Sequence, residues 1–161
     1  MHGLMSRRGW IGAVAKTVAG VAALNALLPA DASALSVPVL DVYKDPSCGC
    51  CKKWVEHLVA NGYTPKVHDR TDMDAFKDSL GVPAAQRSCH TAVFGKYWIE
   101  GHVPASDMKK LMSTNPAGVV GLAAPGMPAG SPGMEVGGRT EKFDVIAVTA
   151  AGKTSVFAKH G

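Results

Sequence analysis

The chain has 161 residues, of which 47% are hydrophobic and 19% are charged, as in an ordinary globular protein that is long enough to bury a core. Its formal net charge is +4, but from Leu35 onward 14 Lys and Arg residues stand against 12 Asp and Glu residues, which leaves about +2. Since the chain has no basic run and no stripe of basic and aromatic residues, the composition argues against a nucleic-acid-binding protein.

Residues 1–34 have the pattern of a cleavable export signal. Two arginines precede an apolar stretch over residues 9–28, and small residues then offer cleavage after Ala32 or Ala34. A membrane anchor is the alternative, but the uninterrupted apolar run after Lys16 is short for a span, which needs about 20 residues. The letters SRRGWIG also resemble the twin-arginine export motif, so the export route stays open. The sequence therefore predicts a periplasmic mature protein with no stable membrane span.

The first half of the mature chain alternates strands with helices. A valine-rich alternating stretch predicts a strand over residues 36–45, and apolar residues at helical spacing predict a helix from about Cys51 to Gly62. Residues 64–70 predict a second strand, followed by a helix that ends at Gly81. The apolar face expected for this second helix comprises Met73, Phe76 and Leu80. This order favours a βαβ unit with parallel strands.

The second half of the mature chain has a different order of predicted elements. Residues 90–101 predict two short strands that turn at Gly95, and residues 104–114 predict a helix. Residues 115–139 are rich in glycine and proline and have no periodicity, so they are expected to form a loop. Residues 142–160 predict a strand, a turn and another strand.

The predicted order of elements is strand, helix, strand, helix, strand, strand, helix, which is that of the thioredoxin-like α/β fold. The strands over residues 142–160 would add a C-terminal β-hairpin to it. We expect residues 35–161 to form one such domain. In this fold the redox-active cysteines lie at the first strand-to-helix turn, where this chain has Cys48, Cys50 and Cys51.

These cysteines can form disulfides or bind metal. Cys48 and Cys51 have C-x-x-C spacing, and Cys89 would then pair with Cys50 or stay free. At a helix N-terminus, however, the free N–H groups and the dipole favour thiolates. Thiolates are soft ligands for Cu(I) and can bridge more than one ion. Zinc usually takes two separated C-x-x-C pairs, so the C-x-C-C cluster favours copper.

Cys89 and His90 precede the third predicted strand. In the thioredoxin-like fold the loop before that strand lies against the active-site turn, so both side chains are expected to approach the cysteine cluster. His102 follows the fourth strand and is a further candidate ligand. By contrast, His57 is expected to be solvated and His160 to be free.

Two methionines, Met127 and Met134, lie in the Gly/Pro-rich loop, which is too polar to need core methionines. A thioether suits Cu(I) better than Zn(II), so both are candidate ligands, and the loop is expected to fold over the cysteines. The alternative is that they only pack against the site. The methionines expected in the core are Met73, Met108 and Met112.

Three stretches carry a family resemblance: DPSCGCCKKWVEHLVANGY, GVPAAQRSCHTAVFGKYWIEGHVPASDMKKLM and APGMPAGSPGME. Together they resemble the CopG-like copper-resistance proteins, over about residues 39–160. The resemblance implies a periplasmic thioredoxin-like protein that holds cysteine-bridged copper ions. Carried over by motif, the thiolate ligands are Cys48, Cys50, Cys51 and Cys89. The accompanying motif residues are His90, His102, Met127 and Met134.

The leading hypothesis is a periplasmic protein of copper resistance or homeostasis that binds more than one Cu(I) per chain. Its partners would be copper ions and other periplasmic copper-handling proteins, and copper redox activity is left open. The second hypothesis is a thiol-disulfide oxidoreductase that uses Cys48 and Cys51 and needs neither Cys50 nor the loop methionines. A structural zinc module is the third, which the methionines and the tight cysteine spacing disfavour.

Overall fold

The computed structural model describes residues 39–135 and 137–161. The predicted export signal, residues 1–34, lies outside the described residues. Within the described part of the chain, no helix combines the length and the apolar character that a membrane span requires.

The protein is a mixed α/β structure, whose described residues form a seven-stranded sheet and three α-helices. In chain order the elements are β1 (Leu40–Lys44), α1 (Gly49–Ala60), β2 (Pro65–Asp69), α2 (Met73–Ser79), the 3-10 helix η1 (Ala84–Gln86), β3 (His90–Phe94), β4 (Tyr97–Gly101), α3 (Ala105–Thr114), β5 (Val119–Ala124), β6 (Phe143–Thr149) and β7 (Thr154–His160). The order of strands and α-helices from β1 to α3 is the predicted one.

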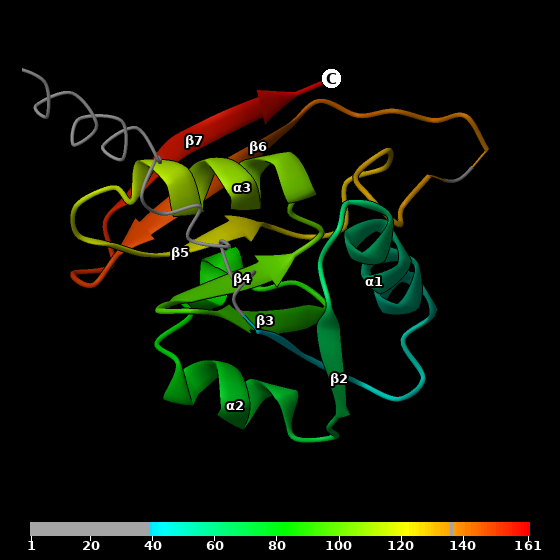
Figure 1. Ribbon diagram of the computed structural model, residues 1–161, viewed down its shortest axis with the longest axis horizontal. Coiled ribbons are helices and arrows are strands. Elements are labelled where there is room, and N and C mark those ends of the chain that lie inside the picture. Colours follow the sequence, from blue (N-terminus) through cyan, green and yellow to red (C-terminus); the bar gives the residue numbers. More distant parts are fainter. Residues whose placement is uncertain (1–38, 136) are drawn as a thin grey trace, which may run out of the picture. The chain divides into compact units, whose positions relative to one another are not determined.

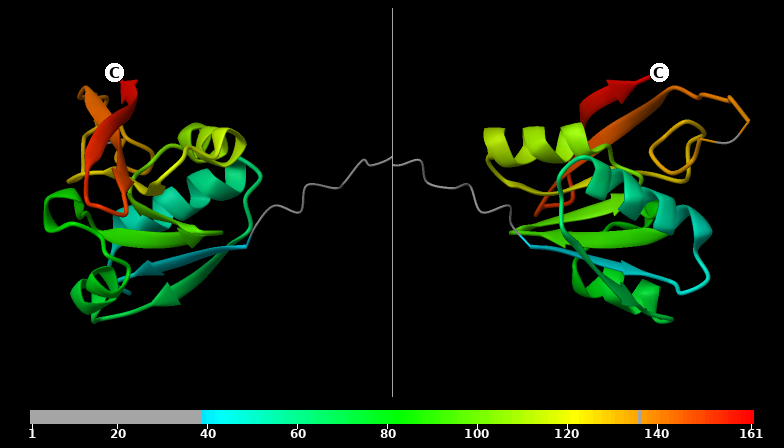
Figure 2. Two further views of the ribbon diagram at one scale, coloured as in Figure 1. Left: turned by 90° about the vertical axis from the view of Figure 1, so that its left-hand side faces the viewer. Right: turned by 45° about the vertical axis from the view of Figure 1, so that its right-hand side comes forward.

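The strands are arranged in the order β2-β1-β3-β4-β5-β6-β7 (Figure 1). β1 and β2 are parallel, which confirms the βαβ unit, and β3 and β4 are antiparallel neighbours on the other side of β1. The helices α1 and α3 lie on one face of the sheet and α2 lies on the other (Figure 2). Both α1 and α3 therefore pack over the main core, which contains Trp54, Leu58, Met108 and Leu111.

Strand β5 corrects the sequence prediction, which placed a loop over the whole of residues 115–139. β5 runs parallel to β4 and buries Leu122, Ala123 and Ala124. Gly121 interrupts the apolar pattern, so the sequence did not reveal this strand. A glycine is required at this position because the Trp98 ring occupies the space that a Cβ would need. Of the described residues that follow β5 up to 139, none lies in a helix or strand, as predicted. The C-terminal hairpin is formed by β6 and β7.

Helix α2 also differs from its predicted packing. The residue that it buries is Lys77, which is 2% exposed, whereas Phe76 is half-buried and its ring packs at a tilt against Tyr43. Lys77 is buried because it forms an ion pair with the buried carboxylate of Glu100 on β4. Among the predicted core methionines, Met108 is fully buried, and Met112 packs against the core while partly buried. Met73 is only half-buried.

Candidate metal centre

The cysteine cluster begins in the turn between β1 and α1. The Asp45 side chain accepts hydrogen bonds from the backbone N–H and the hydroxyl of Ser47, and the Cys48 N–H donates to the Asp45 carbonyl at 3.0 Å. Cys48 then serves as the N-cap of α1, and no described side chain makes a capping hydrogen bond at this N-terminus. The turn therefore places the cysteines at the N-terminus of a helix, as the sequence predicted.

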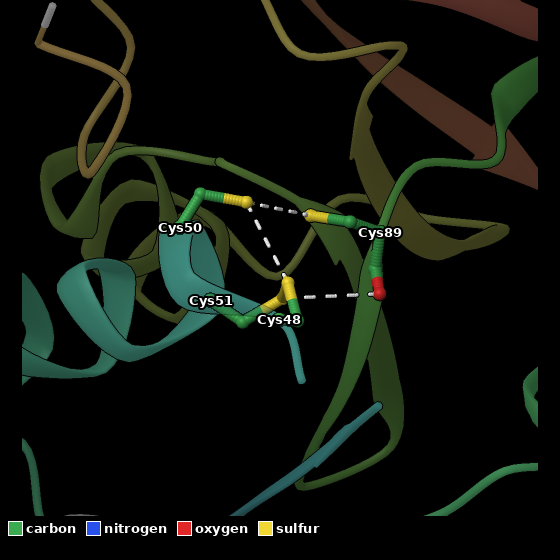
Figure 3. A group of neighbouring side chains, drawn as sticks. All are labelled: Cys48, Cys50, Cys51 and Cys89. Carbon is green, nitrogen blue, oxygen red and sulfur yellow. Dashed lines mark hydrogen bonds between the residues drawn. A yellow bond between two sulfur atoms is a disulfide. The ribbon is translucent and has the colours of Figure 1, made fainter. Parts of the chain in front are cut away.

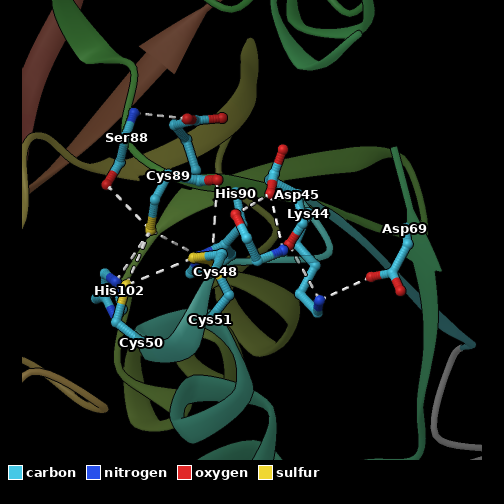
Figure 4. The surroundings of a disulfide bond; sticks show 12 residues. Lys44, Asp45, Cys48, Cys50, Cys51, Asp69, Ser88, Cys89, His90 and His102 are labelled. Atoms are coloured by element: carbon cyan, nitrogen blue, oxygen red, sulfur yellow. Dashed lines mark hydrogen bonds and ion pairs between the residues drawn. A yellow bond between two sulfur atoms is a disulfide. The ribbon is translucent and has the colours of Figure 1, made fainter. Parts of the chain in front are cut away.

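Cys48 and Cys51 form a disulfide, with their Cα atoms 5.4 Å apart (Figure 4). Cys51 is completely buried at the first turn of α1, while Cys48 is half-buried. Cys50, which lies between them in the sequence, keeps a free thiol, as does Cys89. Of the pairings that the sequence allowed, the structure has the C-x-x-C disulfide with Cys50 and Cys89 unpaired.

Cys89 reaches the cluster because β3 lies beside β1. In this antiparallel pair His90 is opposite Lys44, so the residue before β3 lies next to the turn that follows β1. The Cys50 sulfur is 3.5 Å from the Cys48 sulfur and 3.7 Å from the Cys89 sulfur (Figure 3). All four sulfurs lie within 4.8 Å of one another. The expected convergence of Cys89 on the other three is thus present in the structure.

Two histidines extend the donor group on the side of Cys89. The Cys89 sulfur is 3.3 Å from Nδ1 of His90 and 3.2 Å from Nε2 of His102. Both rings are completely buried, and the His90 ring packs on Trp54 at 4.3 Å between centroids. Within the described structure, Nε2 of His90 is buried and has no hydrogen-bond partner. The ring nitrogen that faces Cys89 is Nδ1, so Nδ1, and not this unpaired Nε2, is the His90 atom available to a metal ion held with Cys89.

The protonation states suit a soft metal site. Burial lowers the pKa of His102. Burial also brings the pKa of His90 well below its usual value, and the neighbouring His102 ring and the charge of Lys77 act in the same direction. Both imidazoles are therefore neutral at pH 7, as metal ligands must be. Burial, reinforced by the neighbouring Cys50 sulfur, raises the pKa of Cys89 to about 12. Without a cation Cys89 stays a thiol, so metal binding there would release a proton.

Hydrogen bonds to Glu100 hold the segment that contains Cys89 in place. This carboxylate is fully buried and accepts hydrogen bonds from the Ser88 N–H at 2.7 Å and the Thr91 hydroxyl at 2.6 Å. Lys77 bridges the Glu100 carboxylate and the Ser88 carbonyl. Sequence reasoning missed this pair. The available signals were a charge inside an otherwise apolar strand, YWIEG, and a lysine between Met73 and Leu80 on one helical face.

The Gly/Pro-rich loop reaches the site through residues that the sequence did not single out. The Pro132 carbonyl accepts a hydrogen bond from Nδ1 of His102 at 2.7 Å, and Gly133 packs against the backbone of Cys50 and Trp54. Met127 is 55% exposed and Met134 is half-buried. The loop therefore contacts the cluster by its backbone, and thioether ligation stays a prediction.

The other histidines in the described part of the chain make structural contacts. Nε2 of His57 accepts the Ala105 N–H at 3.2 Å at the start of α3, so the expectation of a solvated His57 was wrong. His160 contacts the Asp107 carboxylate at 2.6 Å and stacks on Phe143, so it is not free. His68 pairs with Asp41 at 2.7 Å. None of these three belongs to the donor groups found among the described residues.

Comparisons with known proteins agree with the site. A family model described as "Protein of unknown function, DUF411" matches residues 86–134, which include Cys89, both site histidines and the loop that contacts them. Two solved structures described as copper resistance protein copG, form 2 and form 1, are each 48% identical to this chain, with TM-scores of 0.73 and 0.72. The matches cover 77% and 76% of this chain and 98% of each of those chains. A search of curated proteins gave no match.

Proposed function

The chain belongs to the CopG-like family of copper-resistance proteins, and from this premise we propose that it binds Cu(I) in the periplasm as part of copper resistance. The observation that carries the proposal is the convergence of four sulfurs within 4.8 Å, with two buried neutral imidazoles on Cys89. Soft sulfur donors select Cu(I) over harder cations, which supports copper as the cargo.

The proposed ligands are the four thiolates of Cys48, Cys50, Cys51 and Cys89, with His90 and His102 on the far side of Cys89. Four thiolates in a partly buried site would repel one another, so one monovalent ion leaves a large uncompensated charge. Thiolates that bridge two or more Cu(I) ions reduce this charge, and we propose more than one ion per chain. Met127 and Met134 would complete the set as neutral donors. Binding by all four cysteines requires prior reduction of the Cys48–Cys51 disulfide.

We further propose a thioredoxin-like domain over residues 35–161 and a cleavable export signal over residues 1–34. The arrangement of β2, β1, β3 and β4 with helices on both faces supports the first part, because the cysteine turn follows the first strand. The amino-acid pattern of residues 1–34 supports the second. Other copper-handling proteins of the periplasm would then be the partners.

The test is a titration of the reduced, metal-free protein with Cu(I) against a strong chelator without oxygen. We expect more than one equivalent per chain, and a lower capacity for Cys89→Ser, although Cys89 lies 38 residues from Cys51. His102→Gln should weaken binding, whereas His68→Gln is a matched control that removes an imidazole outside the donor groups. A capacity of one ion or none, or an unchanged capacity in Cys89→Ser, would contradict the proposal.

The observed disulfide favours a second candidate function, a thiol-disulfide oxidoreductase that uses Cys48 and Cys51. This function would not need Cys50, which is crowded against the disulfide at 3.5 Å from the Cys48 sulfur. It predicts metal-free disulfide reductase activity on insulin that survives Cys50→Ser. We expect little such activity. Rapid turnover that is insensitive to Cys50→Ser would favour the oxidoreductase over the copper site.

A further inference from the structure

We propose that residues 128–135, here called the strap, act as a positioning element that fixes the ring tautomer of His102 and aims its Nε2 at the metal site. Pro132 and Gly133 are the positioning residues. The effect on the tautomer stands on the structure alone, while its consequence for copper rests on the proposed function.

The hydrogen bond between His102 and Pro132 determines which ring nitrogen carries the proton. A carbonyl oxygen can only accept, so Nδ1 of His102 must be the protonated nitrogen in the 2.7 Å contact with Pro132. In the neutral ring Nε2 then presents its lone pair, and Nε2 is the nitrogen that lies 3.2 Å from the Cys89 sulfur (Figure 4). Histidine ligands are commonly oriented in this way, through a carbonyl that holds the other nitrogen.

The strap is held closed by short bonds of its own. The Ser131 hydroxyl and N–H both donate to the Pro128 carbonyl, and the Gly130 N–H donates to the Met134 carbonyl at 3.0 Å. The Gly133 N–H donates to the Glu135 carboxylate at 2.9 Å. Ser131 is completely buried, although it lies in a loop. These bonds give the Pro132 carbonyl a defined direction before any metal binds.

Gly133 lets the strap lie directly on the first turn of α1. Its φ of +85° suits glycine, and a Cβ there would stand 2.7 Å from the Trp54 nitrogen and 3.0 Å from the Cys50 carbonyl oxygen. Both are backbone atoms of α1, so they cannot rotate away as a side chain could. Any side chain at position 133 must therefore lift the strap and carry the Pro132 carbonyl away from His102.

The experiment compares Gly133→Ala with Gly137→Ala. Gly137 also has a positive φ, +61°, but a Cβ there meets nothing within 4 Å. The two variants thus share the backbone penalty and differ in the clash with α1. Histidine 15N NMR of the reduced, metal-free protein reports the tautomer of His102. We expect the Nδ1–H tautomer in the wild type and in Gly137→Ala, and a loss of this preference in Gly133→Ala.

Copper affinity gives the second readout. By competition against a chelator, Gly133→Ala should bind Cu(I) about 10-fold or more weakly than Gly137→Ala, the usual range for loss of a group that orients a ligand. If Gly133→Ala does not fold, Glu135→Ala replaces it, because it frees the Gly133 N–H without adding an atom. A partial shift of the tautomer is then expected.

Three results would overturn the inference: a wild-type His102 with its proton on Nε2, a Gly133→Ala variant with the tautomer and affinity of Gly137→Ala, or an unchanged tautomer in Glu135→Ala when that variant is needed. Failure of the wild type to bind copper would refute the proposed function instead. The tautomer would still decide whether the strap positions His102.

Discussion

The two halves of the cysteine site are built in different ways. The helix side, Cys48, Cys50 and Cys51, is contiguous in sequence and lies in a turn whose hydrogen bonds span two or three residues. The sheet side, Cys89 with its two histidines, depends on contacts between distant segments. These include the pairing of β3 with β1, the Glu100 carboxylate and the Pro132 carbonyl. The helix side thus needs only a local turn, whereas the sheet side needs the whole fold.

This difference has a consequence for metal binding. If the sheet side moves, Cys89 leaves the cluster, whereas the helix side keeps its three cysteine sulfurs on one turn. The fold can therefore control how many donors converge without altering the cysteine-rich turn itself. Variants that disturb one half and spare the other can test this separation.

The largest expected effect comes from Glu100→Ala, beneath the sheet side. It leaves Lys77 buried without its counter-ion and deprives Ser88 and Thr91 of their acceptor. Removing one partner of a buried ion pair costs about 3–5 kcal/mol of unfolding free energy, to be measured by urea denaturation. Asp72→Ala is the control, because the Asp72 and Arg70 side chains are 57% and 34% exposed in their ion pair, so its loss of unfolding free energy should be much smaller. Equal losses in the two variants would contradict the special status of the sheet side.

The second prediction joins the two halves covalently. The Cys50 and Cys89 sulfurs lie 3.7 Å apart, so glutathione disulfide should oxidise these two thiols to a disulfide and yield two molecules of glutathione. The 39-residue separation predicts a gain of about 2–4 kcal/mol in unfolding free energy. Peptide mapping without reduction identifies the bond, and copper capacity should disappear until reductant is added.

In the Cys50→Ser variant no second internal disulfide should form, and Cys89 should remain a thiol or carry glutathione. A wild-type protein that keeps both thiols under the same oxidant would show that the sheet side holds Cys89 too far from Cys50 to react.

The same contrast explains what the sequence could predict. The cysteine turn and the helix after it follow from local patterns, and the element order placed Cys89 beside them. Local patterns could not reveal that Lys77 and Glu100 meet inside the fold, because each resembles a surface charge until its partner is known. The contacts of Pro132 and Gly133 were hidden for a related reason, since backbone contacts leave no mark in the side-chain chemistry of a sequence. Strand β5 was missed because Gly121 makes room for Trp98.

The third prediction concerns Met127 and Met134. It tests whether their thioethers bind copper, separately from the backbone contact of the strap with His102. Replacing both by Leu should change the unfolding free energy by less than about 1.5 kcal/mol, because Leu and Met have similar volumes and Met127 is 55% exposed. If the thioethers are ligands, Cu(I) retention should weaken while the His102 tautomer in the metal-free protein stays unchanged. Chelator competition and histidine NMR measure the two quantities. Unchanged retention would leave the cysteines and histidines as the whole donor set.

The smallest expected effect concerns His57, which lies in α1 behind the helix side and contacts the start of α3. Its neutral Nε2 accepts the Ala105 N–H at the start of α3, and burial lowers its pKa, opposed by the charge of Glu135. The folded protein therefore resists protonation at His57 more than the unfolded chain, whose histidines titrate near 6.5. The resulting stability is present above that pH and is lost as the pH falls through the lower folded-state pKa.

His57→Gln keeps an acceptor that does not titrate, so its unfolding free energy should fall less between pH 7 and pH 5. The difference should be a few tenths of a kcal/mol, because the half-exposed imidazole is partly screened by solvent. His57→Ala is the control, since it lacks the acceptor at every pH and should be less stable than His57→Gln already at pH 7. If all three proteins lose stability in parallel as the pH falls, His57 does not couple the helix side to α3 through its neutral ring.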